Sequence, residues 1–161
     1  MITKPVDRLP AVAYEPGLVS RMLKDSGDEP GILPLLGFVL EQLWDRQDSG
    51  HLRNAAYEQL GGVSGALRQH AERTWKRLFD GRKEHEEAAR RLLTKLVRML
   101  PDGGILLRRR LTRDEVDARQ WEIVTELAAA RLLVLHGGEG EQESAKLAHE
   151  TLITAWPALR D

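Results

Sequence analysis

The sequence predicts a mainly α-helical fold with a short β-hairpin near its C-terminal end. Apolar residues recur at helical spacing through most of the chain, and two short apolar runs flank a polar, glycine-containing loop at positions 137–144. A glycine cluster at positions 61–65 separates two sets of helices. With 161 residues, 42% of them hydrophobic, the chain is long enough for one domain or two small ones.

The N-terminal part is expected to hold an extended lead-in over residues 1–13 and a helical domain over residues 14–62. Pro5 and Pro10 interrupt any periodicity in the lead-in. Apolar spacing and turn residues then predict three helices. They are a short one that begins near Pro16 and ends at residues 25–28, a largely buried one over residues 30–44, and a short one over residues 54–60.

The remaining residues, 63–161, begin with two long predicted helices over residues 66–79 and 83–100. Asp80 and Gly81 separate them. In the second helix, apolar residues form one stripe that needs a partner surface. The stripe consists of Ala88, Ala89, Leu92, Leu93, Leu96, Val97 and Leu100.

The C-terminal third has the element order of a winged helix with one extra helix. A short strand over residues 105–111 is followed by Thr112 and Glu115, whose capping-box spacing predicts a helix start. The pattern then predicts a helix around residues 121–128, strands over 131–136 and 145–148, and a final helix over 150–160. We therefore expect residues 63–161 to form a winged-helix domain.

Composition excludes several classes of protein. Twenty-four Lys and Arg against 25 Asp and Glu give a net charge of −1, which argues against a chain built to coat nucleic acid or an anionic membrane. The absence of cysteine excludes disulfides, thiolate nucleophiles and cysteine-ligated metals. No apolar run approaches the roughly 20 residues that span a bilayer, and the start lacks a signal-peptide core. We expect a cytoplasmic protein without a membrane partner.

The sequence contains no complete pattern of catalytic or metal-binding residues. Ser64 lies near a nucleophile-elbow spacing, but helix rather than strand precedes it. His85 lacks the second histidine of a zinc helix. A phosphate-binding loop needs a Gly-Lys pair, and the sequence has none. The segment is therefore not expected to be an enzyme by itself, and no catalytic residue or metal ligand is assigned.

A DNA-binding function is the alternative that the element order suggests. Arg108, Arg109 and Arg110 could contact phosphates, as basic residues of winged helices do. Glu122 and Glu126 oppose this interpretation, because they place carboxylates on the predicted recognition helix. Nucleic acid is therefore the less favoured partner, and a helix that packs against protein is preferred.

Two positions suggest a ligand. His149 leaves a predicted strand at the start of a helix, where free backbone N–H groups favour an anion and the imidazole can donate to a phosphate. The alternative is that His149 only caps the helix and packs locally. Pro30 lies at a proline-bearing helix start that could press on a flat ring, or could simply be a rigid beginning of that helix.

Three segments together resemble the region that follows the nucleotide-binding core of STAND NTPases. These signal-transduction ATPases are related to NLR immune receptors and apoptosome ATPases, and the similarity is greatest to the bacterial novel STAND NTPases. The segments are Gly27-Asp28-Glu29-Pro30-Gly31-Ile32-Leu33-Pro34-Leu35-Leu36, Gly61-Gly62-Val63-Ser64-Gly65-Ala66-Leu67, and Leu147-Ala148-His149-Glu150-Thr151-Leu152-Ile153-Thr154-Ala155-Trp156-Pro157-Ala158-Leu159-Arg160.

The resemblance implies a helical lid domain of the AAA+ type followed by a winged-helix domain with a short β-hairpin wing. It implies that the proline that packs near the adenine is Pro30. The Met-His-Asp motif, whose histidine contacts the β-phosphate of ADP, falls on Ala148-His149-Glu150, with two residue types altered and the histidine kept. The Ala-His-Glu form resembles the bacterial branch of the class.

The resemblance also implies partners, which belong to the parent proteins of this class. ADP or ATP with Mg²⁺ would bind a P-loop domain of the same parent chain, which would be an ATPase, and no cofactor is expected in this segment alone. C-terminal repeats, such as a WD-type propeller, and a homo-oligomer of the parent are further expected partners. The segment would close over ADP and couple nucleotide exchange to domain rotation and oligomerisation.

Overall fold

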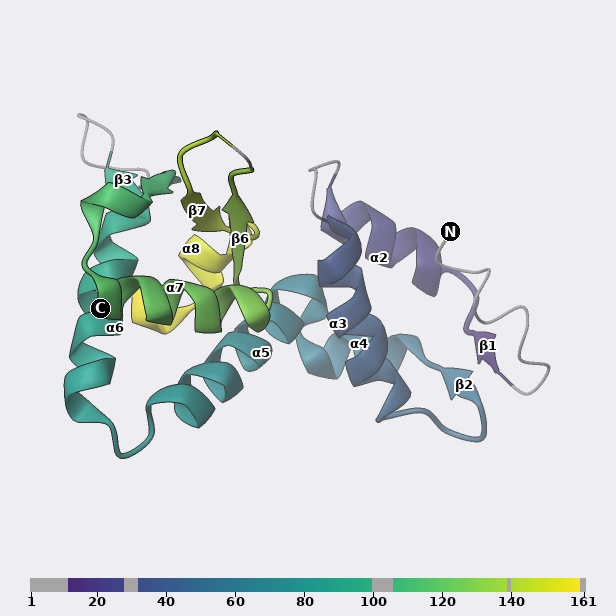
Figure 1. Cartoon of the computed structure of the whole chain (residues 1–161). Helices are drawn as coiled ribbons and strands as arrows, with labels where there is room; N and C mark the ends of the chain where they lie inside the picture. Colours follow the sequence, from purple (N-terminus) through teal and green to yellow (C-terminus); the bar gives the residue numbers. More distant parts are fainter. Residues whose placement is uncertain (1–11, 28–31, 100–105, 139, 160–161) are drawn as a thin grey trace. The chain divides into compact units, whose positions relative to one another are not determined.

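The computed structural model describes residues 12–27, 32–99, 106–138 and 140–159, and it confirms a mainly α-helical chain with small β-sheets (Figure 1). The chain divides into two compact units, residues 1–67 and residues 68–161. The predicted functional domain boundary between residues 62 and 63 stays a prediction. Pro30 lies outside the described residues.

The first unit holds α2 (Leu18–Ser26), α3 (Ile32–Trp44), α4 (Asn54–Leu60) and the start of α5 (Gly62–Phe79). Its small sheet was not predicted: β1 (Ala13–Tyr14) pairs in parallel with β2 (His51–Leu52), which lies in the stretch expected to be a polar connection. Two-residue strands carry too little alternation to be recognised in a sequence. The buried core of this unit includes Leu18, Met22, Val39, Leu43, Tyr57 and Leu60.

The glycine cluster joins α4 directly to α5. Gly61 and Gly62 have φ angles of 77° and 68°, a left-handed conformation that glycine adopts without strain. Gly65 packs its α-carbon against the end of α4, where an added Cβ would lie 1.9 Å from the Leu60 carbonyl oxygen. The predicted helix start at Ala66 was therefore wrong by four residues, because these glycines allow a helix to begin immediately after the previous one.

The second unit contains the rest of α5, then α6 (Lys83–Lys95) and two sheets. The helix predicted to reach residue 100 ends at Lys95, because β3 (Val97–Met99) pairs antiparallel with β4 (Leu106–Arg108). The single strand predicted over residues 105–111 is also wrong, since β4 and β5 (Leu111–Thr112) belong to different sheets. The backbone changes partners between them, with the Arg109 amide donating to the Leu96 carbonyl at 2.8 Å.

The predicted capping box is present, but it starts only a single 3-10 turn, Arg113–Glu115. Val116 then returns to an extended conformation, and α7 (Ala118–Ala129) begins with Asp117 as its N-cap, which accepts a hydrogen bond from the Gln120 amide at 2.7 Å. The box pattern therefore identifies an N-cap correctly without fixing the length of the helix that it starts.

The hairpin was predicted within two residues at each end. It consists of β6 (Leu133–His136) and β7 (Ser144–Leu147), with β7 between β5 and β6 in a three-stranded antiparallel sheet. Figure 1 shows β6 and β7 side by side below the hairpin loop. The expected last helix is shorter, since α8 (Thr151–Ala155) is followed by a 3-10 turn at Pro157–Leu159.

An aromatic cluster fixes the last described segment of the chain to the rest of this unit. Trp156 is 1% exposed and meets Trp75 edge-on, with ring centroids 5.6 Å apart. The Trp75 ring in turn lies 4.5 Å from that of Phe79 on the same helix. Because these rings bury large apolar areas, they hold α8 and the residues before it in place.

Candidate functional site

His149 lies on the connection between β7 and α8 and is 7% exposed. Its Nδ1 accepts a hydrogen bond from the Thr151 amide at 3.1 Å, and its carbonyl accepts from the Leu152 amide at 3.2 Å. The imidazole therefore caps the short helix that follows it. Because Nδ1 is an acceptor, a neutral ring must carry its proton on Nε2, which is then a hydrogen-bond donor.

Nε2 of His149 is buried within the structure. An anion can reach this atom only if the side chain rotates or the residues covering it move. The hydrogen bond from the Thr151 amide supports local capping, which is the alternative interpretation of His149. A phosphate contact stays a prediction. The two are compatible, since they use different nitrogens of one ring.

The helix α2, which precedes Pro30 in the sequence, is joined to α4 by a partly buried hydrogen bond between side chains. Tyr57, which is fully buried, donates its hydroxyl to Asp25 Oδ2 at 2.8 Å. Burial, more than the hydrogen bond to Asp25, raises the pKa of Tyr57 well above its usual value, so the phenol stays protonated. Sequence reasoning missed this contact, because its only signal was a tyrosine in a short apolar helix.

The three arginines proposed for the DNA alternative have three different environments. Arg109 forms an ion pair with Glu115 and donates to the Lys95 carbonyl at 3.1 Å, so it holds the 3-10 turn against α6. Arg108 Nη1 lies 3.5 Å from the Leu147 carbonyl oxygen. Arg110 is exposed. The chain passes from one sheet to another between Arg108 and Leu111, so the three arginines are not residues of one strand.

We expect the ionised Glu115 to stabilise the fold and this contribution to be lost in acid. Hydrogen bonds from the Thr112 amide and then from Arg109 lower the pKa of Glu115 to about 2, below its ordinary value of 4.5. A depressed folded-state pKa stabilises the fold above the ordinary value, and this contribution is lost as the pH falls through about 2. Urea unfolding of wild type and Glu115→Gln should therefore differ most above about pH 5 and converge toward about pH 2.

The control for that measurement is Glu122→Gln, which removes an exposed carboxylate on α7. It should leave the pH dependence of unfolding close to that of wild type. A Glu115→Gln variant whose stability differs from wild type by the same amount at every pH would show that the carboxylate is not held by its charge.

The predicted recognition helix, α7, is committed to packing along one face. Ile123, Val124 and Leu127 are buried. The Glu126 carboxylate lies 3.4 Å from His85 Nε2 and 3.9 Å from Arg82 Nη1. One of the two carboxylates that argued against DNA binding therefore has partners within the chain. The protein-packing role preferred for this helix is consistent with these contacts.

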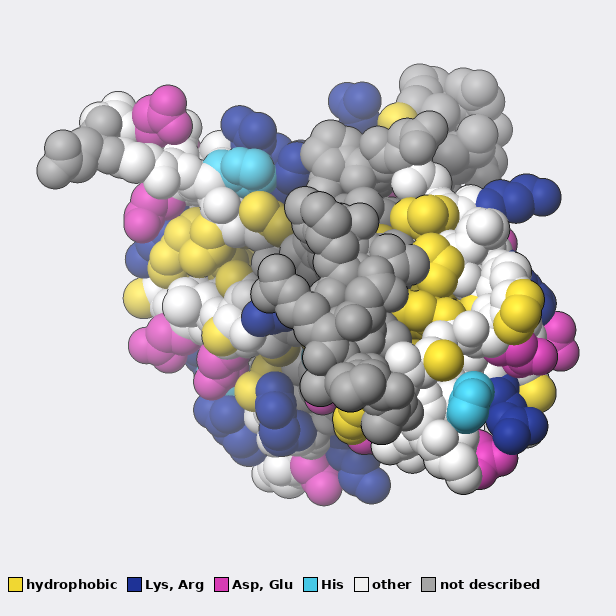
Figure 2. Space-filling view, turned by 90° about the vertical axis from the view of Figure 1, so that its right-hand side faces the viewer, with side chains coloured by type: hydrophobic (Ala, Val, Ile, Leu, Met, Phe, Trp, Pro, Cys, Tyr) yellow, Lys and Arg dark blue, Asp and Glu magenta, His cyan; other side chains and the backbone are white. Residues whose placement is uncertain are grey.

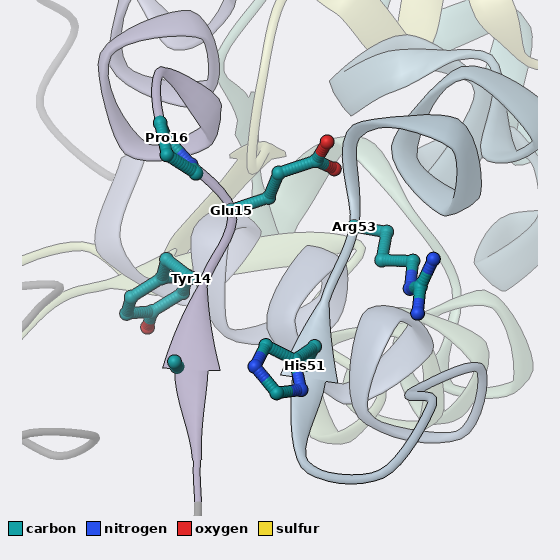
Figure 3. Close-up of a pocket in the computed structure, with 6 residues that line it drawn as sticks. Tyr14, Glu15, Pro16, His51 and Arg53 are labelled. Carbon is teal, nitrogen blue, oxygen red and sulfur yellow. The ribbon is translucent and has the colours of Figure 1, made fainter.

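A shallow hollow of about 440 Å³ opens beside the parallel strands of the first unit. Figure 3 shows that its lining comes from β1 and the residues after it, Tyr14, Glu15 and Pro16, and from β2 and the connection after it, His51 and Arg53. The charged groups have structural partners: Glu15 accepts from the Asn54 amide at 2.5 Å, and Arg53 pairs with Asp48 at 2.6 Å. The hollow therefore presents no convergent set of unused polar groups among the described residues.

Ser64 is exposed in the first turn of α5 rather than on a strand-to-helix elbow, and the described residues contain no group of three His, Asp or Glu arranged to hold a metal ion. None of the described helices is long and apolar enough to cross a membrane.

Figure 2 shows basic and acidic side chains interspersed on one face, with apolar patches between them.

Two of the three segments that carry the resemblance are the glycine link between α4 and α5 and the strand-to-helix connection that holds His149. Residues 1–161 match the model of a family of STAND-class NTPases. That family is Novel STAND NTPase 1, and the chain belongs to it. No curated protein and no solved structure matches the chain.

Proposed function

We propose that this chain is the regulatory region of a STAND-type signal-transduction ATPase. Residues 14–62 would form the lid and residues 63–161 a winged-helix domain. Both would close over ADP or ATP with Mg²⁺ bound to a P-loop domain of the same parent protein. Membership of the Novel STAND NTPase 1 family supports the class, and the element order of the second unit supports the winged-helix assignment.

The observation that carries the proposal is the hydrogen bond that His149 accepts at Nδ1. The Thr151 amide occupies Nδ1, so the neutral ring has its N–H at Nε2, the donor that a β-phosphate requires. With ADP in the core, this donor would link the winged helix to the nucleotide and hold the protein closed. Exchange for ATP would remove the link, free the domain to rotate and let the parent oligomerise in the cytoplasm.

A ligand biases two conformations only through unequal binding to them, so the test compares two nucleotides. In the full natural protein that contains this region, His149→Ala should weaken ADP binding by roughly 5- to 150-fold and leave ATP affinity within about threefold. Titration with each nucleotide measures both constants. The matched control is His51→Ala, which removes an exposed histidine in the first unit.

Two results would contradict this role. Unchanged ADP affinity in a folded His149→Ala protein would leave His149 as a helix cap only. An equal loss of ADP and ATP affinity would show binding without discrimination between states, and therefore no switch at this residue.

A further inference from the structure

The strand β6 forms the outer edge of the three-stranded sheet, and no other described strand pairs with its far side. The Ala148 amide donates to the Leu132 carbonyl at 2.9 Å, so Leu132 and every second residue after it direct their N–H and C=O groups toward β7. The peptide groups of Val134 and His136 therefore face β7. Those of Leu133 and Leu135 face outward, where a further strand could pair with them.

The same edge exposes apolar side chains on both faces of the strand. Leu135 is 45% exposed and Val134 is 37% exposed. Among the described residues, only two other large apolar side chains, Leu23 and Trp44, are exposed to a similar extent. An open edge flanked by apolar side chains is a template for strand addition.

One face of the sheet also carries positive charge that nothing in the described structure neutralises. The register pairs Val134 with Lys146 and His136 with Ser144, so these four side chains share a face. Arg110 immediately precedes β5 on the other side of β7. Neither Arg110 nor Lys146 pairs with an acidic side chain of the described residues, and Nε2 of His136 has no hydrogen-bond partner among them.

The electrostatics of His136 agree with this arrangement. Burial, and then the charges of Lys146 and Arg110, lower the pKa of His136, and no carboxylate acts in the opposite direction. The face is therefore short of negative charge. Strands in a sheet lie about 4.8 Å apart, so the long Lys146 side chain can reach past β6 to a carboxylate on an added strand.

We propose that the β6 edge and the face carrying Lys146, Arg110 and His136 bind an extended acidic polypeptide segment by strand addition. Main-chain hydrogen bonds to Leu133 and Leu135 would supply affinity. Acidic side chains of the added strand would contact Lys146, and its apolar side chains would cover Val134 or Leu135. A nucleic acid fits less well. Pairing with the outward-facing peptide groups of Leu133 and Leu135 requires a partner backbone with alternating N–H and C=O groups, which a sugar-phosphate backbone lacks.

The probe is a fluorescent peptide of about ten residues that alternates Glu and Val, compared with the same pattern of Lys and Val. Anisotropy titration into the 161-residue chain should show binding of the acidic peptide only. Lys146→Glu should weaken it by about tenfold or more, whereas Lys76→Glu, an equal charge reversal on α5, should not. Leu135→Pro removes one outward-facing N–H and should abolish binding.

Amide hydrogen exchange on the wild-type chain gives a readout that needs no variant. The acidic peptide should slow exchange at Leu133 and Leu135 more than at Val134 and His136. The proposal is overturned if the acidic peptide does not bind at millimolar concentration or if the basic peptide binds equally well. It is also overturned if the peptide slows amide exchange at other residues instead. The same holds if duplex DNA binds more tightly than the peptide and depends on Lys146 in the same way.

Discussion

Gly65→Ala should destabilise the chain by about 3 kcal/mol or more, the upper range for a group forced into a packed site. The new methyl carbon would lie 1.9 Å from the Leu60 carbonyl oxygen and 2.8 Å from its carbon, so backbone rather than a flexible side chain blocks it. Relief requires separating α4 from α5, and those helices share the left-handed turn at Gly61 and Gly62. Urea unfolding followed by circular dichroism measures the loss.

Gly37→Ala is the matched control. Gly37 lies inside α3, and an added Cβ there meets nothing within 4 Å. Since alanine is the better helix former by about 1 kcal/mol, this variant should be stabilised by up to that amount. A Gly65→Ala protein as stable as wild type would mean that α4 and α5 are not packed as described.

Trp156→Ala should cost about 3–5 kcal/mol, the usual loss when a buried tryptophan is truncated. Trp156 is 1% exposed and packs edge-on against Trp75, which also donates to Glu86 at 3.2 Å. Removing the indole leaves a cavity beneath α8. We also expect weaker protection of the Thr151 amide from exchange, because the hydrogen bond that fixes His149 lies at the start of that helix.

Trp44→Ala tests whether the effect comes from burial. Trp44 is 44% exposed at the end of α3, so its truncation should change stability by less than about 1 kcal/mol. Equal losses in the two variants would contradict the packing assigned to Trp156.

The helices were predictable where an apolar stripe and its flanking turn residues agree, as in the short helix over residues 54–60. The hairpin after residue 131 was predictable from its two apolar runs. The errors share a physical cause. Val97 continues a helical stripe by spacing, yet its backbone pairs with Arg108, and a sequence pattern does not contain that long-range contact. The parallel pairing of β1 with β2 was missed for the same reason.

For the site, the sequence pattern located His149 correctly at a strand-to-helix connection, and the structure shows which of its nitrogens is engaged. The pattern could not indicate that Arg109 is bound to Glu115, because that pairing depends on how the chain turns between two sheets. The Tyr57–Asp25 bond and the open β6 edge are also tertiary features. Residue type and spacing identify candidates, whereas packing decides which of their atoms are available.

The most direct test of the regulatory role is the nucleotide that the full natural protein retains on purification. Wild type, His149→Ala and His51→Ala would be denatured and their released nucleotides separated by chromatography. If His149 holds the closed state, wild type and His51→Ala should contain bound ADP, and His149→Ala should have lost it or contain ATP instead. Equal ADP in all three proteins, or nucleotide in none of them, would contradict this role for His149.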